Sequence, residues 1–169
     1  FFDDDGVLAG DTQIIKDGIL VTGISDLASA AQLGTAPTGN GRRQSSRRKA
    51  YSRMTNTFFE RGTDKLEDMI ASIQHGYMLF ETDNGMEDPK NWAIQCVAQY
   101  GIEIVDGKLT DNYVSPVVMS GYVPDLLKSI SMISDDFEIS GSGFCGKGYK
   151  EWVRVSDGGP ALKVRVKLG

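Results

Sequence analysis

A cysteine within a glycine-rich stretch is the part of this sequence most suited to chemistry. Residues 141–149 read Gly-Ser-Gly-Phe-Cys-Gly-Lys-Gly-Tyr, so four glycines surround Cys145 and Lys147 follows two positions later. Glycine permits positive φ and close approach of other groups, so we expect an accessible loop. A nearby cation favours the thiolate, which is both a nucleophile and a soft metal ligand. Cys145 could therefore be a nucleophile, a metal ligand, or a small residue in a tight turn.

The rest of the chain offers few partners for such a thiol. His75 is the only histidine, and we place it in the last turn of a helix over 63–75, where a structural or surface role is favoured. Nothing in the sequence brings His75 to Cys145 as a nucleophile–base pair. Residues 141–146 match G-x-G-x-x-G by letter, but no helix is expected to follow, and no phosphate-binding loop is found. Cys145 would need partners from elsewhere.

Composition indicates a water-soluble protein of ordinary type. The 169 residues are 40% hydrophobic and 24% charged, and the net charge of −5 argues against a general basic nucleic-acid binder. No apolar run approaches the length of a membrane span. Cys96 and Cys145 have dissimilar surroundings, which favours a reducing cytoplasm over a disulfide framework. The start at Phe1, without a methionine, indicates a fragment of a longer protein.

Turn signals and alternating apolar residues predict mainly antiparallel hairpins. Asp-Gly pairs at 17–18 and 106–107 lie between apolar runs, as type I′ hairpin turns require. The expected elements are strands at 12–16, 19–24, 53–59, 77–80, 92–104, 108–119, 151–155 and 161–168, and helices at 26–33, 63–75 and from Pro124. Ser25 is the expected cap of the first helix, 84–89 an expected loop, and Cys96 a buried structural residue. The predicted class is α+β, a sandwich or partial barrel with two or three short helices in a single domain over 1–169.

Residues 35–52 stand apart as a basic segment without apolar periodicity. Arg42, Arg43, Arg47, Arg48 and Lys49 fall within eight positions. A solvated, flexible loop is the favoured interpretation, and a patch for a phosphate, an acidic peptide or nucleic acid is the alternative. No aromatic residue interrupts the run, which disfavours binding of single-stranded nucleic acid.

Several stretches together resemble the C-terminal domain of the TldD/PmbA family, once called modulators of DNA gyrase and now regarded as metallopeptidases. The matching stretches are FFDDDG at 1–6, PTGNGRR at 37–43, RMTNT at 53–57, GYVPDLL at 121–127 with Ile130, GFCGK at 143–147, and the strand that closes with Gly159-Pro160. They span nearly the whole chain in the expected order. The chain is thereby identified as similar to a hydrolase of the metalloprotease class.

The resemblance implies a zinc cofactor and assigns Cys145 to it. In the family, two histidines of a His-Glu-x-x-x-His helix and a cysteine of a Gly-x-Cys-Gly-Lys motif hold the metal, and the glutamate acts as general base. The cysteine matches Cys145, whereas the histidine motif would lie upstream of Phe1. Phe144 stands where the family often has threonine. Retention of Cys145 indicates the metal-bearing TldD-type subunit, and the 169 residues alone are expected to be inactive.

The resemblance also implies the substrate and the partners. The family acts on extended or unfolded peptides, which can bind as an added strand, and it forms homodimers or heterodimers with a paralogous subunit in the cytoplasm. Arg53, Thr55 and Asn56 lie in a matched motif and are the expected substrate-binding residues; stabilisation of a strand and turn is their alternative role. No catalytic residue is expected in this chain, and neither membrane nor nucleic acid is expected as a partner. The alternative function is a non-catalytic peptide-binding or dimerisation partner domain.

Overall fold

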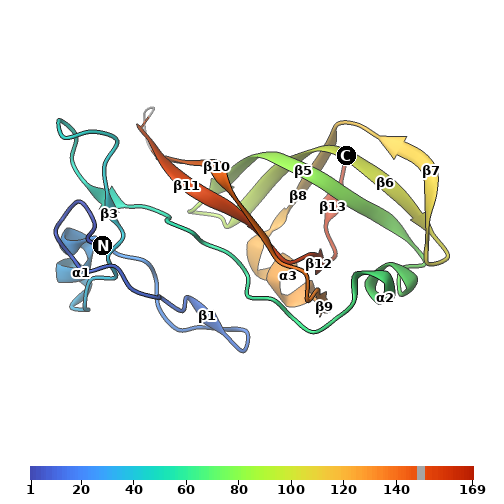
Figure 1. Ribbon diagram of the computed structural model, residues 1–169, viewed down its shortest axis with the longest axis horizontal. Coiled ribbons are helices and arrows are strands. Elements are labelled where there is room, and N and C mark those ends of the chain that lie inside the picture. The colour runs from blue at the N-terminus through green and yellow to red at the C-terminus, as the bar shows by residue number, and fades with distance from the viewer. Residues whose placement is uncertain (148–150) are drawn as a thin grey trace. The chain divides into compact units, whose positions relative to one another are not determined.

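Antiparallel strands joined by tight turns dominate the structure, a computed structural model that describes residues 1–147 and 151–169 (Figure 1). The contacts divide the chain into two units. The first, here called the ribbon unit, comprises Phe1–Phe59 and Glu138–Gly159, and the second, the sheet unit, comprises Glu60–Phe137 and Pro160–Gly169. Each unit is thus built from segments that are distant in the sequence.

The ribbon unit consists of three two-stranded sheets and one helix. Its elements are β1 (Ile15–Lys16), β2 (Ile19–Leu20), α1 (Leu27–Leu33), β3 (Gly41–Arg42), β4 (Tyr51–Ser52), β10 (Glu138–Lys147) and β11 (Glu151–Gly159). β1 pairs with β2, β3 with β4, and β10 with β11, all antiparallel. β10 and β11 are by far the longest of these strands, and they carry the cysteine motif (Figure 1).

The expected hairpin and helix near the N-terminus are confirmed with shorter limits. Asp17 and Gly18 have φ of 50° and 76°, the positive values that a type I′ turn needs. Asp26, not Ser25, caps α1: its carboxylate accepts from the backbone N–H of Ser29 at 2.6 Å. Gly34 closes the helix in the left-handed conformation at φ 67°.

The sheet unit is built on a five-stranded antiparallel sheet. Its strands run in the order β13-β8-β6-β5, and β7 also pairs with β6. The elements are α2 (Leu66–Ala71), β5 (His75–Asp88), β6 (Ala93–Val105), β7 (Lys108–Val114), β8 (Val117–Tyr122), α3 (Val123–Ser129), β9 (Met132–Ile133), β12 (Leu162–Lys163) and β13 (Lys167–Leu168). The short β9 and β12 form a separate pair.

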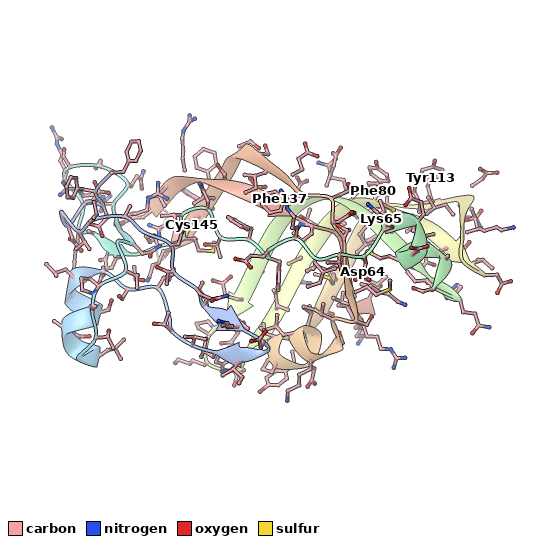
Figure 2. All side chains as sticks on the ribbon, turned by 60° about the horizontal axis from the view of Figure 1, so that its bottom comes forward. Asp64, Lys65, Phe80, Tyr113, Phe137 and Cys145 are labelled. Atoms are coloured by element: carbon pink, nitrogen blue, oxygen red, sulfur yellow. The ribbon has the colours of Figure 1, made fainter. Side chains whose placement is uncertain are left out.

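The long strand expected at 92–104 is observed as β6, although Trp92 lies outside it, with a φ of 57° and 52% exposed. Within β6, Ala98 and Ile104 are almost completely buried. On the neighbouring strands, the ring of Phe80 stacks on that of Tyr100 at 4.8 Å, and Tyr113 lies 6.4 Å from Tyr100; Phe80 and Tyr113 are labelled in Figure 2. The sheet is therefore held by cross-strand aromatic pairs as well as by its hydrogen bonds.

Several expected limits in the sheet unit are wrong. His75 begins β5 and does not end a helix, because the carbonyls of Ile73 and Gln74 accept from the turn between β6 and β7. The expected loop at 84–89 is largely strand, since β6 pairs with β5 as far as Asp88. The strand expected at 108–119 is divided at the cis peptide bond before Pro116, and β7 and β8 pair with different parts of β6.

The strands expected at 151–155 and 161–168 do not pair with each other, and no strand is found at 53–59. β11 pairs with β10, and β12 and β13 pair with β9 and β8. Gly158 and Gly159 have φ of 138° and 143° and continue β11 beside β10; a Cβ on Gly158 would lie 2.2 Å from the carbonyl oxygen of Glu138. The α+β class and the antiparallel pairing are confirmed, and no sheet within the described ranges closes into a barrel. Across those ranges, no helix is long and apolar enough to cross a membrane.

Candidate functional site

Cys145 lies in a strand, near the end of β10, and not in a loop. In β10 it stands opposite Val153 of β11, and the residue is 7% exposed (Figure 2). The expectation of an accessible thiol on a loop is therefore wrong. The motif continues into residues 148–150, which lie outside the described residues.

Two of the glycines around Cys145, Gly143 and Gly146, lie close to side chains of β11, whereas Gly141 has open space around it. A Cβ on Gly143 would lie 2.5 Å from the carboxylate of Asp157, and a Cβ on Gly146 would lie 2.8 Å from the ring of Trp152. Both distances are shorter than real Cβ contacts. The glycine pattern thus keeps β10 close to β11 side chains and holds the thiol in a strand of defined register.

The side chain of Arg53 donates hydrogen bonds to backbone carbonyls of both β10 and β11. Its Nη2 donates to the carbonyl of Cys145 and, at 3.0 Å, to that of Glu151. Arg53 is 1% exposed. Its own backbone is held by Asn40: the Arg53 N–H donates to the Asn40 carbonyl at 2.9 Å, and the Asn40 amide donates to the Arg53 carbonyl at 3.1 Å. A buried guanidinium therefore connects Cys145 to the 40–53 segment.

The charge of Arg53 is only partly compensated. Its Nε and Nη1, and Oε2 of Glu151, are buried and make no hydrogen bond within the described part of the chain. The ammonium group of Lys147 makes no hydrogen bond to Oε2 of Glu151; its Nζ donates to the carbonyl of Ser52 at 2.9 Å. Burial of a charge without full hydrogen bonding is costly. The site thus holds a cation at the backbone of Cys145 at the expense of stability.

A cleft of about 410 Å³ lies elsewhere in the ribbon unit. It is lined by Phe1, Phe2, Asp3, Asp4, Ala9, Gly39, Arg42, Thr55, Asn56, Gly141, Arg154, Val155 and Ser156. Two of the residues expected to contact substrate, Thr55 and Asn56, are among them, and Oδ1 of Asn56 accepts from the backbone N–H of Ser156 at 3.3 Å. Arg53 and Cys145 are not in this lining. The structure therefore groups the site residues as two pairs: Thr55 with Asn56, and Arg53 with Cys145.

Arg42 and Arg154 also line the cleft, and the sequence did not predict either of them as a substrate-binding residue. Arg42 donates to the carbonyl of Met54 at 2.9 Å and to that of Arg154 at 2.7 Å, and the Arg154 guanidinium lies 5.7 Å from the ring centre of Phe144. Arg42 belongs to the basic segment, where charge density alone gives no sign of a partner 112 positions away. Only the pairing of β10 with β11 makes this contact possible.

The basic segment also finds partners within the ribbon unit. Arg43 lies 3.5 Å from the carboxylate of Asp4, and Arg48 lies 3.8 Å from that of Glu151. Lys49 lies 5.4 Å from the ring centre of Tyr51. Within the segment, β3 and β4 pair with each other on either side of residues 43–50, so the segment is in part a hairpin.

A complete metal site is not found among the described residues, where no group of three histidine, cysteine or carboxylate side chains could hold an ion. Cys145 fits zinc as a single soft donor with a fixed backbone position. His75 lies in the sheet unit, 65% exposed, with Nε2 3.4 Å from Glu103. Hydrogen bonds from Asn112 and then from His75 lower the pKa of Glu103. His75 thus has a carboxylate partner on the sheet.

Comparisons with known proteins identify relatives along the whole chain. A family model described as the PmbA/TldA metallopeptidase C-terminal domain matches residues 1–167. A zinc metalloprotease TldD homolog from Saccharolobus solfataricus is 36% identical over 100% of this chain and 38% of its own length. A metalloprotease from Synechocystis is 36% identical over 97% of this chain and 35% of its own length.

Solved structures show the same fold at lower identity. TldE from Thermococcus kodakarensis superposes with a TM-score of 0.73 at 24% identity, over 99% of this chain and 35% of that one. A candidate modulator of a DNA gyrase from Thermotoga maritima gives a TM-score of 0.71 at 20% identity, with the same coverage. The chain spans just over a third of the length of these relatives. From the match over residues 1–167, the chain belongs to the PmbA/TldA metallopeptidase C-terminal domain family.

Proposed function

We propose that this chain is the C-terminal part of a zinc-dependent metallopeptidase that acts on extended or unfolded peptides. The relatives named as metalloproteases, each covered by this chain over about a third of its length, support the enzyme class. The observation that carries the proposal is the GFCGK stretch at 143–147, which lies in β10 with the carbonyl of Cys145 bound by Arg53. In this proposal the chain supplies one metal ligand and part of the peptide cleft.

The remaining ligands are proposed to be two histidines from the part of the protein outside these 169 residues. One thiolate and two imidazoles leave a fourth position open, as catalytic zinc sites require. When bound, zinc would lower the pKa of its water and polarise the scissile carbonyl. The contribution of Cys145 is to hold its thiolate at one place on β10, without which the donor set is incomplete.

The cleft residues are proposed to hold the peptide. The Thr55 hydroxyl and the Asn56 amide can bind backbone groups of an extended chain. On β11, the N–H groups of Trp152 and Ser156 and the carbonyl of Arg154 already bond to the side chains of Gln44, Asn56 and Arg42. β10 has an edge without a partner strand among the described residues, and we propose that a peptide adds there as a further strand. Arg53, expected to bind substrate, is 1% exposed. We therefore assign Arg53 to support of the site and leave substrate contact to the other two.

The subunit arrangement follows from the same proposal. We expect a homodimer or a heterodimer with a paralogous subunit, in the cytoplasm, with a peptide as substrate. A second function, a non-catalytic peptide-binding or dimerisation partner domain, is supported by the cleft that Thr55 and Asn56 line. Peptide binding without metal-dependent hydrolysis would distinguish this function from the enzyme.

Metal removal from the full-length protein tests the proposal. We expect hydrolysis of an unfolded peptide, loss of that hydrolysis after dialysis against a chelator, and recovery when zinc is added. The purified 169-residue chain is expected to show no hydrolysis under the same conditions. Hydrolysis by the full-length protein that survives complete removal of metal, or by the 169-residue chain alone, would contradict the proposal.

A further inference from the structure

We infer that Arg53 is a positioning residue for Cys145: its buried guanidinium fixes the backbone of the cysteine relative to β11. The inference deepens the proposed function and rests on it, because it concerns how this chain presents its proposed metal ligand. In this role Arg53 touches neither substrate nor metal. It acts through the carbonyl groups that it binds.

One nitrogen of Arg53 donates hydrogen bonds to both strands of the β10–β11 pair. Nη2 of Arg53 donates to the carbonyl of Cys145 on β10 and to the carbonyl of Glu151, the first residue of β11. Hydrogen bonds from a charged donor are stronger than those between neutral groups. The guanidinium thus ties the end of the ribbon together at the residue that carries the thiol.

The backbone of Arg53 is held by Asn40, so its guanidinium can fix the position of the carbonyls that it binds. Two backbone-directed hydrogen bonds join Arg53 to Asn40, whose Oδ1 lies 2.8 Å from the hydroxyl of Thr38. That hydroxyl accepts from the N–H of Ser25 at 2.7 Å, just before α1. The network runs from the start of α1 to Cys145 within the ribbon unit. A side chain held at both ends in this way restricts the strand that it contacts.

The charge of Arg53 is poorly explained by stability alone. Two of its nitrogens are buried without a hydrogen-bond partner in the described residues. Arg53→Met removes this buried charge at similar volume, and it leaves the carbonyls of Cys145 and Glu151 without the guanidinium donor. We expect Arg53→Met to retain the fold and to lose the position of Cys145.

Thiol labelling in the full-length protein measures the position of Cys145 directly. Tryptic cleavage after Lys128 and Lys147 isolates Cys145, whereas cleavage after Lys90 and Lys108 isolates Cys96, so iodoacetamide uptake can be followed for each thiol separately. In metal-free protein, Arg53→Met should raise the labelling rate of Cys145 by about tenfold or more, since loss of charge-assisted hydrogen bonds frees the strand. Cys96 lies in the sheet unit and should label at an unchanged rate.

A conservative variant and a metal signal separate positioning from general stability. Arg53→Lys keeps a cation that can reach one carbonyl, and it should restore much of the slow labelling. In cobalt-substituted protein, the thiolate-to-metal charge-transfer band should weaken in Arg53→Met and recover in Arg53→Lys. If Arg53→Met does not fold, Arg53→Gln carries the test, because its neutral amide replaces the charge-assisted donor with a weaker one. Faster labelling of Cys145 than in the wild-type protein would support the positioning role, and an equal rate would overturn it.

The outcomes are distinct for the inference and for the proposed function. An unchanged Cys145 labelling rate in Arg53→Met, or equal increases at Cys145 and Cys96, would overturn the positioning role. Failure of the wild-type protein to bind zinc or cobalt through Cys145 would instead overturn the proposed function. The labelling of metal-free protein does not depend on the metal, so the two failures cannot be confused.

Discussion

The two cysteines of this chain differ in burial and in the groups that surround them. Burial raises the pKa of the Cys96 thiol, and the charge of Glu87 adds to the effect. Cys96 therefore stays protonated near neutral pH, as expected of a structural residue. Cys96 is half-buried, where the sequence predicted a buried residue, whereas Cys145 is buried and its backbone is held by Arg53. This difference makes Cys96 a matched control for every experiment on Cys145.

Thr55 provides a test of the cleft at the scale of a single residue. Its side chain is exposed and lines the cleft, so Thr55→Trp should narrow the space available to a peptide. We expect the KM for an unfolded peptide to rise by about tenfold, equivalent to about 1.4 kcal/mol of binding, with little change in kcat. Steady-state kinetics of the full-length protein measures both.

Thr57→Trp is the control for that change. Thr57 is exposed two positions further on and is not among the cleft-lining residues. Its replacement should leave KM unchanged. Equal effects of the two substitutions on KM, or no effect of either, would contradict the proposal that the peptide binds in the cleft.

At the scale of elements, α1 depends on its cap. Asp26 accepts hydrogen bonds from both the N–H and the hydroxyl of Ser29, at 2.6 Å each. Burial alone would raise its pKa, but these hydrogen bonds outweigh that effect, and the pKa of Asp26 is lowered. The charged cap thus stabilises the helix that precedes the Thr38–Asn40–Arg53 network.

The cap gives a prediction with a definite pH dependence. Asp26→Ala should speed hydrogen exchange of residues 27–33 by about fivefold at pH 7, for a loss of about 1 kcal/mol. Because the folded pKa lies below the unfolded value, the contribution of the charge is present above about pH 4 and is lost as pH falls through the folded pKa. Asp26→Asn keeps a cap without charge, so its difference from wild type should vanish in acid.

Exchange measured by mass spectrometry at several pH values decides the matter. A difference between Asp26→Asn and the wild-type protein that grows as the pH falls would contradict the expected sign of the pH dependence. A helix that exchanges at the same rate in all three proteins would show that Asp26 does not cap α1 in solution.

Local chemistry makes some elements predictable, and long-range pairing hides others. The Asp17-Gly18 and Asp106-Gly107 turns are predictable because positive φ leaves few residue choices. The cysteine motif resembles a loop, since glycine-rich sequence alone gives no sign that a Cβ would strike Asp157 or Trp152 on another strand. The pairing of β10 with β11 sets both the burial of Cys145 and the position of Arg42.

The same limit applies to the candidate site. Resemblance selects Cys145, Arg53, Thr55 and Asn56, but spacing cannot show that they form two pairs in different places. Arg53 and Cys145 are 92 positions apart and meet only through the folded ribbon. Their roles stay proposals, and the expectation of a single domain over 1–169 stays a prediction beside the two units of contact.

At the scale of the whole molecule, charge and coverage limit what this chain does alone. The net charge is −5, and Arg42, Arg43 and Arg48 of the basic segment have partners within the ribbon unit. This distribution favours the interpretation of the segment as part of the fold over a nucleic-acid patch. The chain covers 38% of the Saccharolobus relative, which leaves room for the other proposed ligands in the complete protein.

The zinc content of a Cys145→Ser variant of the full-length protein decides whether this cysteine is a metal ligand. Wild-type and Cys96→Ser proteins should each bind about one zinc per subunit. Cys145→Ser should bind zinc at least about 100-fold more weakly, since loss of outer-shell partners alone costs about 10–100-fold. Metal analysis after dialysis against a buffered zinc concentration gives the result. Equal zinc in Cys145→Ser and wild type would contradict the assignment of Cys145 as a metal ligand.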